Sequence, residues 1–128
     1  MIQNDPASVY RQALNKTFST AFNGIQHFFK TERNGKIQAA VTGFTLLLSF
    51  YLQLSPVEWI FILFCIGAVI GLEMMNTALE KLCDHVHKDY HPVIKIVKDV
   101  AAGAVLFVSI ISVIIGLIIF IPKILPLI

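Results

Sequence analysis

The stretch that decides the fold of this chain reads Glu73-Met74-Met75-Asn76-Thr77-Ala78-Leu79-Glu80-Lys81-Leu82-Cys83-Asp84. It continues directly from the uncharged apolar run Trp59–Leu72. On a helix that turns by about 100° per residue, three carboxylates and one carboxamide fall within about 80° of one another; these are Glu73, Asn76, Glu80 and Asp84. A charged group at the bilayer centre costs on the order of 2.5–3.5 kcal/mol, so this face predicts a functional site.

The composition supports a membrane protein. The 128 residues are 56% hydrophobic, and the excess lies in long uncharged runs such as Ile37–Leu54 and Ala101–Ile121. Runs of this length predict transmembrane helices in a single all-α domain spanning residues 1–128. The first fifteen residues are too polar for a cleavable signal peptide, so none is expected. A net charge of +2 gives no reason to expect nucleic acid as a partner.

The pattern predicts an N-terminal interfacial amphipathic helix followed by three transmembrane helices, over residues 6–33, 36–54, 57–85 and 99–121. Asp5-Pro6 is typical of a helix start, with Asp5 as the N-cap. Ser55-Pro56 predicts a tight turn between the first two spans. Residues 85–98 are expected to form a loop or a short interfacial helix, and Pro122 is expected to end the third span.

The basic residues predict the orientation. They lie before the first span and between the second and third, whereas the segment between the first two spans has none: Arg11, Lys16, Lys30, Arg33 and Lys36, then Lys81, Lys88, Lys95 and Lys98. The positive-inside rule therefore places the N-terminus and the acidic face in the cytoplasm, and the C-terminus outside. We expect a multi-pass protein of the bacterial inner membrane whose site is open to cytoplasmic ATP.

The acidic face suggests phosphoryl transfer. Mg²⁺ is usually held by one or two carboxylates together with substrate phosphates, and Glu32 and Glu80 could supply them if their helices touch. Lys98 could neutralise phosphate charge. Glu73 lies about 10 Å deeper along the helix than Glu80, at about 1.5 Å per residue. A carboxylate at that depth could act as general base toward the hydroxyl of a lipid.

Each of these residues also has a purely structural interpretation. Glu73 could be a buried acid bonded to a neighbouring polar side chain, and Glu80 and Asp84 could form a solvated helix end. Lys98 could be an interfacial anchor. The histidines at 85, 87 and 91 could hold zinc, although the first two point apart on a helix. The sequence contains no Walker A loop and no glycine-rich kinase loop, so ATP chemistry here would be of an unusual kind.

The order and spacing of several motifs resemble the prokaryotic diacylglycerol kinase family, over about residues 15–115. The residues that carry the resemblance are Phe22-Asn23-Gly24-Ile25, Thr31-Glu32-Arg33-Asn34, Glu73 to Glu80 with Asp84, Asp89-Tyr90-His91-Pro92, and Lys98 to Leu106. The His-Pro pair and the run Ala101-Ala102-Gly103-Ala104-Val105-Leu106 are more similar to its undecaprenol kinase branch. Ala13 stands where the enterobacterial diacylglycerol branch has an arginine.

The resemblance implies a homotrimer with active sites shared between subunits. It implies Glu73 as catalytic base, Asn76 as a residue that orients the site, and Glu32 and Glu80 as ligands of the cofactor Mg²⁺. The nucleotide would be bound by Glu32, Glu80, Asp89, Tyr90, His91, Lys98 and Asp99. Lys98 would also take part in catalysis, and the lipid would contact Glu73 and Ala102.

The function predicted is transfer of the γ-phosphoryl group of ATP to a membrane lipid alcohol. Undecaprenol is the expected acceptor, and diacylglycerol is the alternative. A rival of another class is a small proton-coupled exporter, which also uses a membrane glutamate in a short chain. A non-catalytic oligomeric membrane protein is a third possibility, but it would leave the acidic face unexplained.

Overall fold

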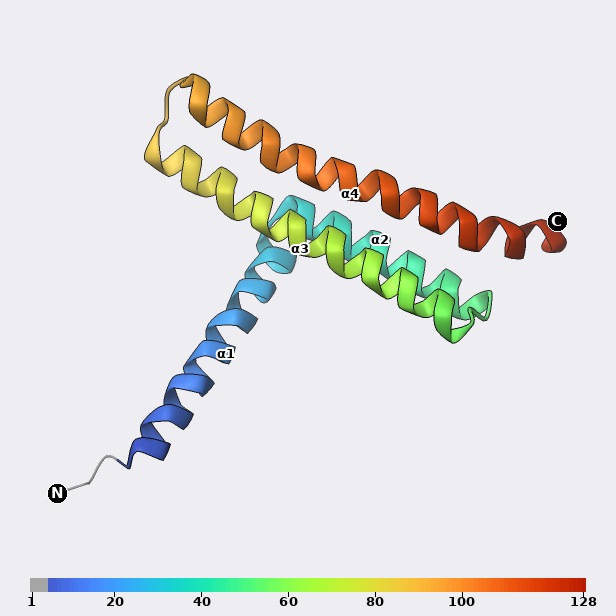
Figure 1. Ribbon diagram of the computed structural model, residues 1–128, viewed down its shortest axis with the longest axis horizontal. Coiled ribbons are helices and arrows are strands. Elements are labelled where there is room, and N and C mark those ends of the chain that lie inside the picture. The colour runs from blue at the N-terminus through green and yellow to red at the C-terminus, as the bar shows by residue number, and fades with distance from the viewer. Residues whose placement is uncertain (1–4) are drawn as a thin grey trace. The chain divides into compact units, whose positions relative to one another are not determined.

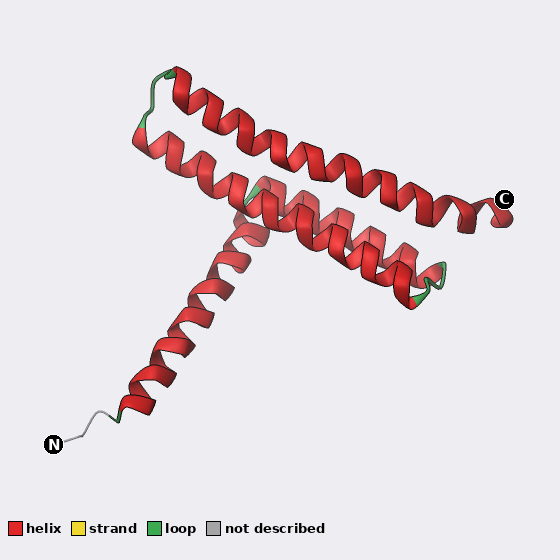
Figure 2. Ribbon diagram, viewed as in Figure 1, coloured by secondary structure: helices red, strands yellow, loops and turns green. Residues whose placement is uncertain are grey.

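The computed structural model describes residues 5–128, and every regular element in that part of the chain is helical (Figures 1 and 2). The elements are α1 (Pro6–Thr31), α2 (Arg33–Tyr51), α3 (Pro56–Val86), α4 (Pro92–Ile124) and a short 3₁₀ turn, η1 (Leu125–Leu127). The predicted all-α class is therefore confirmed. The chain divides into two compact units, one up to Lys36 and one from Ile37 onward, and each is described separately.

In the first unit, α1 begins as its sequence predicts. The Asp5 side chain accepts a hydrogen bond from the backbone N–H of Ala7 at 3.2 Å, and Pro6 occupies the first helical position. The helix ends at Thr31, earlier than the expected residue 33. It stops there because the backbone at Glu32 is extended (φ −80°, ψ 136°), while the Glu32 N–H still donates to the Phe28 carbonyl at 3.2 Å.

The junction between α1 and the start of α2 depends on close packing at Gly35. A Cβ atom at this position would lie 1.9 Å from the Phe28 carbonyl oxygen and 3.1 Å from the Phe29 Cα. Both the Phe28 side chain and Gly35 are buried. Only glycine leaves room for the Phe28 carbonyl to lie this close to residue 35. The same carbonyl accepts the hydrogen bond from the Glu32 N–H at the end of α1.

α2 begins at Arg33 and ends at Tyr51, so it lies three residues earlier at both ends than the expected span 36–54. Its end belongs to the second unit. The Leu54 N–H bonds to the Ser49 carbonyl and the Gln53 N–H to the Phe50 carbonyl, which is the Schellman arrangement. Gln53 holds the left-handed position with φ 54°, where glycine is usual. These two hydrogen bonds pair backbone carbonyls of the last turn of α2 that have no partner within the helix.

The predicted turn at Ser55-Pro56 is confirmed and has a reciprocal cap. The Glu58 backbone N–H donates to the Ser55 hydroxyl at 3.3 Å, and the Ser55 N–H donates to the Glu58 carboxylate at 2.8 Å. Pro56 occupies the first turn, where its missing N–H costs nothing. α3 then runs from Pro56 to Val86, one residue beyond each expected end.

α3 and α4 pack along one another (Figure 1). Near the Pro56 end, Ile62 and Ile119 are buried together with Leu54 from the preceding turn. The Lys123 ammonium pairs with the Glu58 carboxylate at 3.0 Å across the same end of the two helices. Apolar burial and one ion pair therefore join α3 to α4 at the end opposite the acidic face.

α4 differs most from the sequence prediction. It begins at Pro92 rather than residue 99, because the His91 side chain accepts from the Val93 N–H at 3.2 Å and caps the helix. Of residues 85–98, expected to form a loop or a short interfacial helix, only 87–91 lie outside α3 and α4. The expectation that Pro122 ends the helix is wrong, since the Leu125 N–H still bonds to the Ile121 carbonyl and α4 continues to Ile124.

Two segments among the described residues are long and apolar enough to cross a membrane. They are Pro56–Val86 and Pro92–Leu127, in which an 18-residue window reaches a mean hydropathy of 2.1 and 3.2 respectively. Large apolar side chains on both are exposed, including Phe64 at 76% and Ile118 at 67%. This exposure suits a lipid surround. α2 is not among these segments, so a third crossing remains a proposal.

Candidate active site

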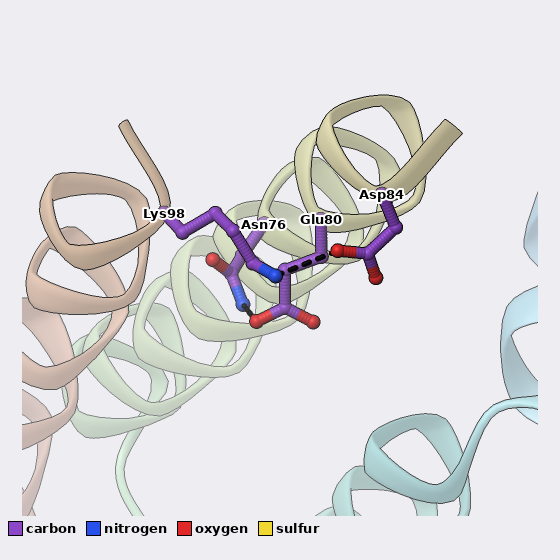
Figure 3. Close-up of polar contacts among 4 residues, drawn as sticks. All are labelled: Asn76, Glu80, Asp84 and Lys98. Atoms are coloured by element: carbon purple, nitrogen blue, oxygen red, sulfur yellow. Dashed lines mark hydrogen bonds and ion pairs between the residues drawn. The ribbon is translucent and has the colours of Figure 1, made fainter. Parts of the chain in front are cut away.

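Asn76 is a buried residue on the acidic face of α3, and its carboxamide bonds to a carboxylate of the same face. Its side chain is buried, with 6% of its surface exposed. The Asn76 Nδ2 donates to the Glu80 Oε1 at 3.1 Å, one helical turn away (Figure 3). Glu73 and Glu80 are both half-buried. The Asn76 bond holds the Glu80 carboxylate. The role in orienting the site that the resemblance implied for Asn76 stays a prediction.

The oxygen of the same carboxamide has no hydrogen-bond donor within the described part of the chain. Among residues 5–128, the Asn76 Oδ1 is the buried side-chain oxygen that has no hydrogen-bond partner. A buried acceptor in this state costs about 1–3 kcal/mol unless something bonds to it. An oxygen without a partner, next to a half-buried carboxylate, is therefore a candidate contact for a bound group.

Lys98 extends from α4 toward the acidic face of α3 (Figure 3). Its Nζ donates to the Asp84 Oδ1 at 2.7 Å, and the two residues lie on opposite sides of the 87–91 loop. The structure therefore brings Lys98 to the α3 face that carries Asn76, Glu80 and Asp84 (Figure 3). The sequence predicted Lys98 for this site and left Asp84 without a role.

A cavity of about 330 Å³ opens at this end of α3 and α4. Its lining includes five residues predicted to bind the nucleotide, namely Asp89, Tyr90, His91, Lys98 and Asp99. It also includes Asp84, His87, Lys88, Ile94 and Lys95. Glu80 is not part of this lining, although its side chain lies beside Lys98 in Figure 3. The cavity is lined by three ammonium groups, three carboxylates and the aromatic ring of Tyr90, and two of the lysines pair with aspartates of the same lining. Lysine ammonium groups are common phosphate ligands, and an aromatic ring can stack on a base.

Two of the predicted nucleotide ligands also have local structural partners. The His91 Nδ1 accepts from the Val93 backbone as the N-cap of α4. The Asp99 carboxylate pairs with Lys95 one turn earlier on the same helix. Neither contact needs a ligand, and the nucleotide role of all five lining residues stays a prediction.

Glu32 lies in the first unit, at the end of α1. Its carboxylate lies 3.1 Å from the His27 Nε2, and 18% of its side-chain surface is exposed. The predicted pairing of Glu32 with Glu80 joins residues of different units and stays a prediction. Ala102, predicted to contact the lipid, is exposed on α4.

The donor set fits a metal held largely by substrate phosphates. The described residues contain no cluster of three or more His, Cys, Asp or Glu side chains able to enclose an ion, including around the histidines considered for zinc. They do contain the Glu80 carboxylate and the adjacent Asn76 carbonyl oxygen. Mg²⁺ commonly takes one or two carboxylates and completes its octahedron with phosphate oxygens and water. The available donors are oxygen atoms, which suit Mg²⁺ better than zinc, since zinc is usually bound by Cys and His.

Comparison with known proteins identifies the family of this chain. Residues 19–120 match the family described as prokaryotic diacylglycerol kinase. The chain belongs to this family. It is 43% identical to the undecaprenol kinase of Bacillus subtilis over 117 residues, which cover 89% of this chain and 95% of the relative. It is 38% identical to the diacylglycerol kinase of Synechocystis sp. over 117 residues, covering 87% of this chain and 64% of that protein.

Membership confirms the predicted family and the predicted enzyme class, a lipid kinase. It leaves the exporter and the non-catalytic oligomer without support. Helical spacing placed Asp84 on the acidic face but left it without a role, and the contribution of Lys95 to the cavity was missed. Lys95 precedes Lys98 by three residues, so helical spacing could have indicated it.

Proposed function

We propose that this chain phosphorylates undecaprenol, using Mg-ATP as the donor. The observation that carries the proposal is the 43% identity to an undecaprenol kinase over 95% of that protein's length. The geometry supports it, because a half-buried glutamate on an apolar helix lies about three turns from a polar cavity bearing lysines. Such a site suits a reaction between a lipid head and a water-soluble anion.

Glu73 is proposed as the general base. It would take the proton of the lipid hydroxyl while the hydroxyl oxygen forms a bond to the γ-phosphorus of ATP. The bond from that phosphorus to the β–γ bridging oxygen breaks, so the products are the lipid phosphate and ADP. Positioning and electrostatic stabilisation supply most of the rate in phosphoryl transfer.

Glu80 is proposed as a ligand of Mg²⁺, with Glu32 as a second carboxylate on the strength of the resemblance. A bound Mg²⁺ would neutralise charge on the β- and γ-phosphates. Asn76 would hold the Glu80 carboxylate in place through their 3.1 Å hydrogen bond. Lys98 would add a cation toward the phosphates, and Asp89, Tyr90, His91 and Asp99 would contact the rest of the nucleotide.

The tail of the acceptor would remain among the helices, with Glu73 and Ala102 contacting the lipid. A second cavity, of about 350 Å³, supports this placement within the unit that follows Lys36. It is lined by side chains of α2, α3 and α4, including Val69, which lies one turn before Glu73. An isoprenoid chain in this region would bring its terminal hydroxyl toward Glu73.

The setting is proposed to be the bacterial inner membrane, with the N-terminus and the active site in the cytoplasm. The basic segments around residues 11–36 and 81–98 support this orientation. A homotrimer with shared active sites is proposed on the resemblance to the family. Exposed apolar side chains on α3, such as Leu63 and Phe64, are compatible with contacts to lipid or to another subunit.

Diacylglycerol is the second candidate acceptor, because a diacylglycerol kinase is 38% identical to this chain. Purified protein in mixed micelles should be given γ-labelled ATP with undecaprenol or diacylglycerol at equal mole fractions. We expect label on undecaprenol at the higher kcat/KM. Preference for diacylglycerol would reverse the assignment, and transfer to neither lipid would refute the proposed function.

A further inference from the structure

Asp84 is the member of the acidic face to which the proposed function gives no role. Its side chain is 67% exposed, and its Oδ1 accepts from the Lys98 ammonium at 2.7 Å. The contact joins α3 to α4 across the 87–91 loop, and both residues line the cavity of about 330 Å³. Figure 3 shows the Lys98 side chain reaching across to Asp84 past Asn76 and Glu80.

Stability does not account for this pair. Ion pairs between exposed side chains contribute little to folding, because water and salt screen them. The packing of α3 on α4 is instead secured by the apolar cluster around Ile62 and Ile119 at the other end. An uncompensated carboxylate would moreover repel phosphate from a cavity that holds several lysines. Pairing with Lys98 reduces the repulsion from Asp84.

We propose that Asp84 is a positioning residue that holds the Lys98 ammonium at the cavity, so that its other N–H groups face the phosphates of ATP. A lysine ammonium has three N–H donors, and the bond to Asp84 uses one. The lysine side chain is long and flexible, so without an anchor its charge would be spread over many positions. The inference rests on the proposed function and assigns a role within the same site.

The main alternative is that Asp84 binds the metal itself. A metal ligand would act independently of Lys98, and its loss would change the Mg²⁺ dependence. A positioning residue acts only through Lys98. The effect of removing it should therefore disappear once Lys98 is gone.

The test compares Asp84→Asn, Lys98→Ala and the double variant, with kcat, KM for ATP and Mg²⁺ dependence measured for each. Asp84→Asn should lower kcat/KM for ATP by about tenfold, because a misplaced cation loses part of its effect on the transition state. In the Lys98→Ala background, Asp84→Asn should cause no further loss. Asp84→Glu should recover part of the activity, and Mg²⁺ dependence should match that of the wild type.

Glu58→Gln is the matched control. It removes an ion pair between the same two helices at their other end, and glutamine can still cap α3 through the Ser55 N–H. Its kinetics should stay within about twofold of wild type, as expected for a charge far from the site. Thermal unfolding in the same detergent should give similar midpoints for the Asp84 and Glu58 variants.

Several outcomes would overturn the inference. They are wild-type kinetics for Asp84→Asn, losses that multiply in the double variant, a changed Mg²⁺ dependence, or unfolding of Asp84→Asn alone. Affinity for Mg-ATP is measured in parallel by calorimetry, and Asp84→Asn should weaken it. That measurement needs no lipid, so it tests Asp84 even if the wild type accepts neither undecaprenol nor diacylglycerol.

Discussion

At the scale of single residues, Asn76 connects the parts of the site. Its amide orients Glu80, while its buried Oδ1 has no partner within the described chain. Glu73 lies about one turn deeper along the same helix. In the proposed membrane placement, Glu73 would lie nearest the lipid and Glu80 nearest water, so depth would separate the proposed base from the proposed metal ligand.

Glu73→Gln should abolish turnover while leaving the binding of Mg-ATP largely intact. Glutamine keeps the size of the side chain but cannot take a proton, and a positioned general base typically contributes about 10²–10⁴-fold to rate. Single-turnover transfer to undecaprenol and calorimetric titration with Mg-ATP measure the two properties separately. Loss of nucleotide binding with the chemistry preserved would contradict the base assignment.

Glu80→Ala should weaken Mg-ATP binding and raise the Mg²⁺ concentration needed for activity. Glu80→Gln is the sharper variant, because its side-chain oxygen still accepts the bond from Asn76 while the charge that would bind the metal is lost. Both variants should show the shifted Mg²⁺ dependence, and Glu80→Ala should also unfold at lower temperature, since leaving a buried amide unpaired costs about 1–3 kcal/mol. An unchanged Mg²⁺ titration for both would remove Glu80 from the metal site.

At the scale of elements, the helix ends determine where the functional residues stand. Glu32 follows α1 because the backbone turns out of the helix there, and its N–H closes on the Phe28 carbonyl. In the second unit, His91 and Pro92 start α4 early enough to bring Lys98 onto the first turns of a continuous helix. Helix caps therefore position three of the predicted site residues: Glu32, His91 and Lys98.

Gly35→Ala should destabilise the α1–α2 junction and lower kinase activity. The added Cβ would meet the Phe28 carbonyl at 1.9 Å, and the backbone must move to relieve it. The same carbonyl accepts the Glu32 N–H, so Glu32 would shift as well. Overpacking of this kind costs about 1–3 kcal/mol, measurable as a lower unfolding midpoint in detergent.

Gly24→Ala is the control within the same unit. No atom lies within 4 Å of a Cβ built at Gly24, so alanine fits there without displacement. Its higher helix propensity should keep or raise the stability, by up to about 1 kcal/mol. Equal behaviour of the two alanine variants would contradict the role given to Gly35.

At the scale of the whole molecule, the number of membrane crossings sets the side on which the C-terminus lies. Three crossings from a cytoplasmic N-terminus would place Ile128 outside, whereas two crossings by Pro56–Val86 and Pro92–Leu127 alone would return it to the cytoplasm. We propose three. Alkaline phosphatase fused after Ile128 should then be active, and a green fluorescent protein fused there should stay dark. The reverse pair of results would exclude α2 as a crossing.

Local sequence rules were sufficient for much of this protein. The Asp5-Pro6 start, the Ser55-Pro56 turn, the all-α class and the lipid kinase family were all predicted correctly. Each depends on neighbouring residues or on a motif of fixed spacing. The shared face of Asn76 and Glu80 followed from helical geometry in the same way, and their hydrogen bond confirms it.

Only the tertiary structure decided the contacts between residues that are distant in the sequence. Lys98 reaches Asp84, and Lys123 reaches Glu58, only because α3 and α4 pack side by side. The sequence pattern predicted that this helix begins at residue 99, whereas Pro92 lies in its first turn, a position that proline favours. Periodicity describes one helix at a time, and the partner of a charged side chain on a neighbouring helix depends on how the helices pack.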